Sequence, residues 1–201
     1  MNNTSLQAIP APLHWMNAPL DWQSNAVDAL SIKAGAKTDL FVDPQNEQAV
    51  DNAPRLLFES QDRHFLFSAN VSVDFRTAFD AGVLLLYAGP QQWAKLCFEY
   101  TPDHHPMIVS VVTQTVSDDC NSQPIAGNAV YLRIARLDRA FAFHFSEDSR
   151  FWQLARLFRL GSIDALKIGF SAQSPTGASC SARFTDITFE KRRLAALRNG
   201  E

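Results

Sequence analysis

Apolar and polar residues alternate with a period of two along much of the chain, and the clearest stretch lies at residues 64–75. From Phe65 to Phe75 most alternate residues are apolar, and most residues between them are polar. Successive side chains of a β-strand point to opposite faces of the sheet, so this stretch predicts a long strand with one buried face. The run VLLLY at 83–87 is apolar throughout and predicts a strand that is covered on both faces.

Further strands are predicted at 27–33, 55–59, 93–100, 108–115, 129–136, 140–145, 165–171 and 182–190. Segment 117–127 is rich in Asp, Asn, Ser, Pro and Gly and is predicted to be a loop. Segment 151–160 has apolar residues near helical spacing, but its neighbours are all strands, so we interpret it as a strand or irregular edge. About ten strands with short turns predict an all-β fold, namely an antiparallel two-sheet jelly-roll sandwich.

We expect the core between the sheets to be formed by the inward-facing residues of these strands. They include Phe65, Phe67, Val71, Leu96, Phe98, Val130, Leu132, Ile134, Phe143 and Phe145. The 201 residues fit one domain, which would bury roughly 70% of its unfolded surface. We divide the chain into a flexible N-terminal segment (1–12), the sandwich domain (13–190) and a charged C-terminal tail (191–201).

Composition narrows the choice of partners. The net charge is −3 and 46% of the residues are hydrophobic, which favours neither disorder nor binding to nucleic acid. The chain begins without a secretion signal, and no stretch approaches the roughly 20 apolar residues of a membrane span. We therefore expect a cytoplasmic protein with no nucleic-acid or membrane partner. The three cysteines are widely spaced, which predicts reduced thiols.

Five short segments, taken in order, carry a family resemblance. They are WMNAP at 15–19, TDLFVDP at 38–44, AG at 81–82 with WAKLCFEY at 93–100, VVT at 111–113 with SD at 117–118, and IGFSAQSP at 168–175. Together they resemble the family catalogued as domain of unknown function 1349, which is related to the regulation-of-enolase protein of yeast. The resemblance implies a concanavalin A-like lectin/glucanase fold but no established reaction. The family tends to have tryptophan where this chain has Asp119, so no ligand-stacking role is carried over to that position.

The principal candidate site lies on the strand at 93–100. Because Leu96 and Phe98 are expected to point inward, Trp93, Lys95 and Glu99 share the opposite face. Lys95 and Glu99 are about 13 Å apart along a strand that rises roughly 3.3 Å per residue, which suits a shared ligand better than a direct ion pair. We expect these charges to bind a hydroxyl-rich ligand, with Trp93 offering a flat surface to a sugar ring. The alternative is a cross-strand or same-face ion pair, worth a few tenths of a kcal/mol if exposed.

Other strands and a loop are expected to complete a pocket on the concave sheet. Tyr131, Arg133 and His144 point away from the predicted core and are expected to join this groove. Ser117 and Asp118 follow a strand in the predicted loop, from which side chains reach a groove. For Asp118 the alternative is a role in a turn or cap.

No metal or cofactor is expected. Asp39 and Asp43 offer fewer oxygens than the six to eight of a Ca²⁺ site, so we interpret them as turn residues. The five histidines lack the spacing of HxH or HExxH sites. Phosphate-loop, dinucleotide and Gly-x-Ser-x-Gly motifs are also missing, which argues against the common kinase, dehydrogenase and hydrolase classes.

Three functions follow as hypotheses. The first is binding of a carbohydrate or other hydroxyl-rich small molecule on the concave sheet. The second is a glycoside-active enzyme that uses Glu99 with Asp118, because such enzymes need two carboxyl groups about 5 Å apart for retention or about 6.5 to 9.5 Å apart for inversion. The third is a non-catalytic regulatory protein, which could form a homodimer through a strand edge.

Overall fold

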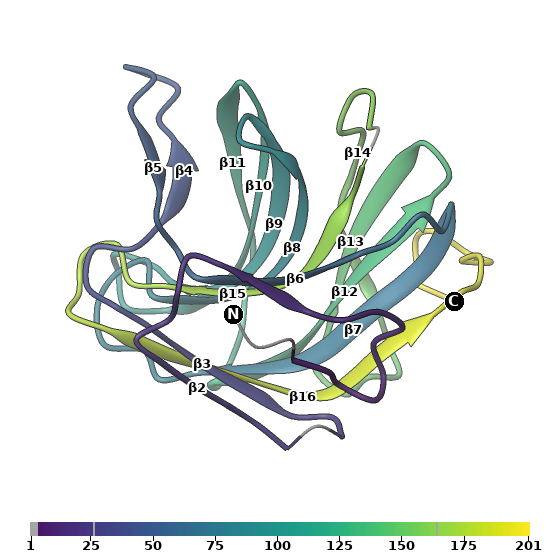
Figure 1. Ribbon diagram of the computed structural model, residues 1–201, viewed down its shortest axis with the longest axis horizontal. Helices are drawn as coiled ribbons and strands as arrows, with labels where there is room; N and C mark the ends of the chain where they lie inside the picture. Colours follow the sequence, from purple (N-terminus) through teal and green to yellow (C-terminus); the bar gives the residue numbers. More distant parts are fainter. Residues whose placement is uncertain (1–3, 26, 164) are drawn as a thin grey trace.

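The computed structural model describes residues 4–25, 27–163 and 165–201, and within them the chain forms two large sheets packed face to face (Figure 1). The first sheet has the order β1-β6-β15-β8-β9-β10-β11. Its strands are β1 (His14–Met16), β6 (Arg55–Glu59), β15 (Lys167–Gln173), β8 (Ala81–Gly89), β9 (Gln92–Tyr100), β10 (Pro106–Gln114) and β11 (Val116–Pro124). All of its pairings are antiparallel.

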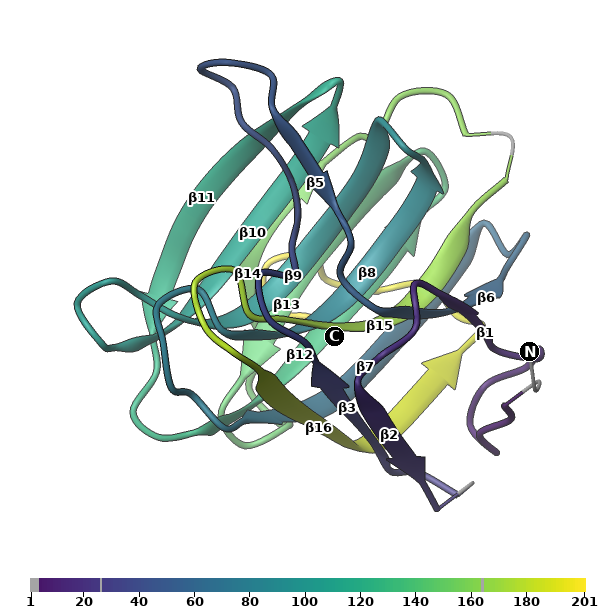
Figure 2. The same ribbon diagram turned by 60° about the vertical axis from the view of Figure 1, so that its left-hand side comes forward.

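The second sheet has the order β14-β13-β12-β7-β16-β3-β2 and is also antiparallel. Its strands are β14 (Gln153–Phe158), β13 (Ala140–Ser146), β12 (Ala129–Leu137), β7 (His64–Val73), β16 (Cys180–Glu190), β3 (Leu30–Ala34) and β2 (Asp21–Ser24). A separate hairpin of β4 (Leu40–Val42) and β5 (Ala49–Asp51) crosses in front of the first sheet in Figure 2. The predicted two-sheet antiparallel sandwich is confirmed.

Period-two alternation placed the core correctly. Every residue of the predicted core is buried, and all of them belong to one cluster between the two sheets. Gly82 on β8 shows how closely the sheets approach, because a Cβ at this position would lie 2.6 Å from Cγ1 of Val71 on β7. A larger residue at position 82 would have to push the two sheets apart.

The prediction of a loop at 117–127 is wrong over most of its length, because residues 116–124 form β11 and pair with β10. This strand lies at the edge of its sheet, and most of its side chains are polar and exposed. An edge strand needs hydrogen bonds on one side only and buries little, so its sequence carries a weak strand signal. The expected edge strand within 151–160 is present as β14.

Both ends of the described chain pack onto the sandwich. Leu6 and Ile9 are buried in the main core, so the described part of the predicted flexible segment 1–12 is held against the domain. In the tail at 191–201, Leu194 and Leu197 pack against Leu66 and its neighbours on the outer face of the second sheet. No helix in the described residues has the length and apolar character needed to cross a membrane.

We expect Leu96→Ala to lower the free energy of unfolding by about 2 to 5 kcal/mol, because it removes fully buried methyl groups and leaves a cavity between the sheets. Denaturant unfolding would measure the change. Leu20→Ala is the matched control, since Leu20 is 65% exposed and its truncation should cost no more than about 0.5 kcal/mol. Equal effects of the two substitutions would contradict the assigned face of β9.

Candidate functional site

The outer face of β9 carries the expected polar residues. Leu96 and Phe98 belong to the core between the sheets, so alternation turns Trp93, Lys95 and Glu99 to the opposite face of the first sheet. Lys95 and Glu99 line a pocket there. Trp93 shares their face but is fully buried, so it offers no open surface on which a sugar ring could stack.

Strand register brings two further polar side chains to this face. Lys95 pairs with Val111 on β10, and Val111 pairs with Asp119 on β11, which places Asp119 in the same row as Lys95. Four residues further along β9, Glu99 pairs with Ala81 on β8. Ala81 in turn pairs with Gln173 on β15. Alanine is small enough for the side chains on either side of it to meet, and Gln173 Nε2 lies 3.5 Å from Glu99 Oε2.

The hairpin of β4 and β5 forms one wall of the pocket. The backbone N–H of Val42 donates a hydrogen bond of 2.9 Å to Ser117 Oγ, which also lies 2.9 Å from Thr113 Oγ1. Ser117 is buried, so its hydroxyl holds the hairpin against the sheet instead of facing a ligand. The hairpin in turn carries Phe41, with Asp39 just before it, to the pocket.

The pocket has a volume of about 390 Å³ and combines acidic, basic and aromatic side chains. It is lined by Asp39, Phe41, Phe79, Lys95, Glu99, Val111, Asp119, Gln173, Pro175 and Thr176. Phe79 comes from the connection between β7 and β8, and Pro175 and Thr176 from the turn between β15 and β16. The lining therefore comes from six parts of the chain, at 39–41, 79, 95–99, 111, 119 and 173–176.

Lys95 lies at the centre of this site and is only 3% exposed. Its Nζ donates hydrogen bonds to Asp39 Oδ1 at 3.1 Å and to Gln173 Oε1 at 2.9 Å. Burial by itself lowers the pKa of Lys95, but the negative charge of Asp39 and the acidic groups of Cys97 and Glu99 together raise it above its usual range. Lys95 is therefore a permanent cation at physiological pH.

Glu99 is mostly protonated at the same pH. Its pKa is raised to about 8, first by burial and then by repulsion from Asp119 and Asp39, while the attraction of Lys95 opposes the shift. The pKa of Asp119 is also raised, mainly by partial desolvation, although this side chain remains exposed at the edge of the pocket. A protonated Glu99 can donate a hydrogen bond, whereas the oxygens of Asp39 and Asp119 can accept them.

Three of the expected site residues lie elsewhere. Tyr131, Arg133 and His144 belong to β12 and β13 of the second sheet, so their side chains face the opposite side of the sandwich from Lys95. Arg133 Nη1 donates a hydrogen bond of 2.7 Å to the carbonyl of Gly200, and His144 Nε2 lies 2.8 Å from the carbonyl of Leu197. The expectation that they join the pocket is wrong, and the last two hold the C-terminal tail in place.

Asp118 is also misplaced by the sequence prediction. Its side chain is 72% exposed, pairs with Arg156 at 2.9 Å and is not part of the pocket, which Asp119 lines instead. Because 117–127 was expected to be a loop, no strand alternation distinguished Asp118 from the adjacent Asp119. In a strand, neighbouring side chains point to opposite faces, and the register with β10 directs Asp119 to the face of Lys95.

Sequence reasoning missed several pocket residues, although a signal for them was present. Asp39 and Phe41 lie in the segment 38–44, and Gln173 and Pro175 lie in 168–175, both of which contribute to the family resemblance. Asp39 was interpreted as a turn residue because two carboxylates are too few for a Ca²⁺ site, and its partner Lys95 lies 56 positions away, where no local pattern indicates it. No group of three or more His, Cys, Asp or Glu residues in the described chain is suited to hold a metal.

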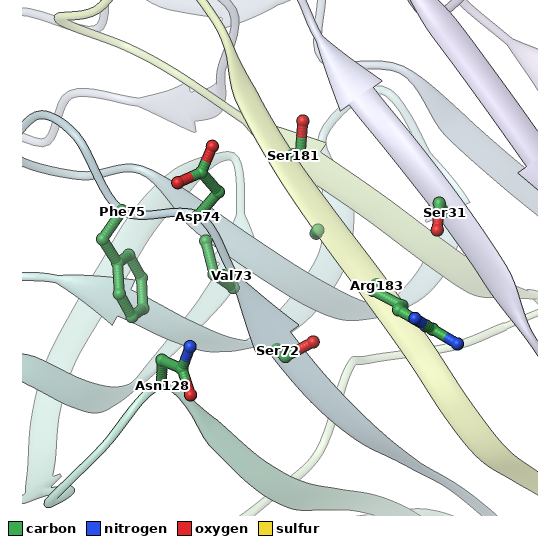
Figure 3. A pocket seen from close by; sticks show the side chains of 9 residues that line it. Ser31, Ser72, Val73, Asp74, Phe75, Asn128, Ser181 and Arg183 are labelled. Carbon is green, nitrogen blue, oxygen red and sulfur yellow. The ribbon is translucent and has the colours of Figure 1, made fainter.

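A second hollow, of about 470 Å³, lies on the outer face of the second sheet (Figure 3). Ser31 and Ser72 lie on either side of β16, with Arg183 between them. The charged side chains at this hollow, Arg183 and Asp74, are both exposed, and Asp74 is paired with Arg76. The pocket on the first sheet, in contrast, contains a charged side chain that is almost fully buried, that of Lys95, and it is therefore the stronger candidate.

Comparison with known proteins agrees with the segments noted in the sequence. A family profile described as "Protein of unknown function (DUF1349)" matches residues 15–192. The chain belongs to this family. A search of curated proteins found no match.

Solved structures similar to this DUF1349 protein share its fold. A functionally unknown protein from Saccharomyces cerevisiae has a TM-score of 0.81 and 22% identity, over 92% of this chain and 97% of that chain. The GH43 protein BlXynB from Bacillus licheniformis has a TM-score of 0.63 and 12% identity, over 82% of this chain. Xylan β-1,4-xylosidase from Bacillus halodurans has a TM-score of 0.62 and 12% identity, over 94%. The match spans only 33% and 41% of these two glycosidase chains.

We expect the stability of the protein to fall as pH rises from about 5 to about 8. Unfolding returns Glu99 from a pKa of about 8 to its ordinary 4.5, so between these values the native state holds a proton that the unfolded state has released. At about 1.4 kcal/mol per pKa unit, the loss amounts to at most a few kcal/mol. Melting temperatures across this range should fall less steeply for Glu99→Gln. Glu59→Gln makes the same chemical change at an exposed position and should keep the wild-type dependence of melting temperature on pH. Parallel melting profiles of the wild type and both variants would contradict the raised pKa of Glu99.

Proposed function

We propose that this domain binds a carbohydrate or other hydroxyl-rich small molecule in the pocket around Lys95. The observation that carries the proposal is the convergence of buried charged and amide groups with two aromatic side chains in one cavity. A volume of about 390 Å³ lies within the range of small-molecule sites, which are about 300 to 1,000 Å³.

The pocket offers what a saccharide requires. Sugar hydroxyls both donate and accept hydrogen bonds, and here a protonated Glu99 donates while Asp119 accepts. Phe41 and Phe79 supply apolar surface for the C–H faces of a sugar ring. Because Lys95 holds Asp39 and Gln173 in fixed positions, the polar groups are oriented before a ligand arrives, which lowers the entropic cost of binding.

A glycan array followed by titration calorimetry tests this proposal. We expect Asp119→Ala to weaken binding of the selected glycan at least about tenfold, which corresponds to the loss of one hydrogen bond to a charged group. Asp118→Ala is the matched control, because the neighbouring carboxylate points to the other face of the same strand and should leave binding unchanged. A glycan that binds equally to both variants, or an array with no positive glycan, would contradict the proposal.

Glycoside hydrolysis is the second candidate, favoured by the presence of more than one carboxyl group in the cavity. A glycosidase pairs a protonated acid with a carboxylate, and Glu99 has the raised pKa of the acid. Asp118 points away, so the carboxylate partner would be Asp119 or Asp39, both of which line the pocket.

If the protein is a hydrolase, Glu99→Gln should reduce kcat on oligosaccharides by at least about a hundredfold, because a sugar alkoxide leaves only with the proton that a positioned acid supplies. Substrate binding should be retained. Release of reducing sugar measures the rate, and calorimetry with the intact oligosaccharide measures binding. Wild-type activity that survives in Glu99→Gln would remove Glu99 from the reaction.

A further inference from the structure

The pocket on the first sheet is lined by more carboxyl groups than cationic groups. Three carboxyl groups line it, those of Asp39, Glu99 and Asp119, whereas Lys95 is the one cation in its lining. Asp39 is already paired with Lys95 at 3.1 Å. Within the described residues, neither Glu99 nor Asp119 takes part in an ion pair.

Lys95 has little capacity left for a ligand. Two of its three ammonium protons are directed at Asp39 Oδ1 and Gln173 Oε1, and its side chain is almost completely buried. Gln173 is engaged as well, because its Nε2 donates to the carbonyl of Phe79 at 3.2 Å. The carboxyl groups in the lining that no cation pairs with are therefore those of Glu99, which accepts one long hydrogen bond of 3.5 Å from Gln173 Nε2, and Asp119.

We propose that the ligand of this pocket carries an amine beside its hydroxyl groups, as an amino sugar does; this inference rests on the proposed function. An ammonium group placed at Glu99 and Asp119 would balance the surplus acid. Asp119 is itself exposed, so the reinforcement of such a pair comes from the aromatic walls, whose faces attract cations, and from the partly buried Glu99. An anionic sugar would meet repulsion from Asp119 and would find no free cation, because Lys95 is already paired with Asp39.

Proton exchange distinguishes an amine from a neutral sugar. Glu99 is neutral in the free protein because burial and the nearby acids Asp119 and Asp39 outweigh the attraction of Lys95; the thiol of Cys97 is the other titratable group close by. A neutral sugar leaves the proton of Glu99 in place. An ammonium group favours the carboxylate, so its binding expels that proton.

Three β-1,4-linked trisaccharides of equal length provide the test, namely the trimers of glucosamine, N-acetylglucosamine and glucose. They differ only in the substituent at C2, which is an amine, an amide or a hydroxyl. We expect calorimetry at about pH 6, where the sugar amine is protonated, to show that the glucosamine trimer binds at least tenfold more tightly than the other two. Titrations in cacodylate and in MES, which differ in ionisation enthalpy, should show proton release on binding of the glucosamine trimer alone.

Glu99→Gln should abolish the proton release and most of the preference for the amine, while the exposed Glu59→Gln should retain both. Equal or tighter binding of the glucose trimer would overturn the amine inference and leave the proposed function intact. Failure of the glucosamine trimer to bind at millimolar concentration would also overturn it. The proposed function has its own test: it is contradicted if Asp119→Ala weakens the binding of no glycan on the array.

Discussion

The buried ammonium group of Lys95 is the interaction on which the arrangement of the pocket depends. A charge taken out of water is costly unless partners surround it, and here the partners come from two distant segments, Asp39 before β4 and Gln173 on β15. The ion pair between Lys95 and Asp39 therefore helps to hold the β4–β5 hairpin over the first sheet. The same requirement orients Gln173 so that its amide reaches toward Glu99.

The two outer faces of the sandwich are covered by different segments and to different extents. A sheet packed on one side presents its other face to water, and apolar or buried polar groups on that face need a cover. On the second sheet the C-terminal tail closes over Arg133 and His144 and uses their nitrogens as anchors. On the first sheet the hairpin covers only part of the face and leaves a cavity, so polar groups there remain available to a ligand.

The pocket also explains why two acids with similar sequence surroundings differ in character. Asp118 and Asp119 are adjacent, yet one forms an exposed pair with Arg156 and the other faces Lys95 and Glu99. Glu99 carries its proton at neutral pH because burial and neighbouring acids disfavour the charged form. One cavity therefore holds a fixed cation, a neutral acid and an acceptor carboxylate, which is a varied set of hydrogen-bonding groups.

The sequence by itself determined the all-β fold, the core between the sheets and the face of β9 that carries Lys95 and Glu99. Each of these follows from period-two alternation, which is a local property of a strand. Only the tertiary structure decided that His144 and Arg133 lie on the far side of the sandwich, that Asp119 and not Asp118 enters the pocket, and that Asp39 pairs with Lys95. Sheet membership, strand register and the partner of a buried charge depend on contacts between residues far apart in the chain, and alternation within one strand does not specify them.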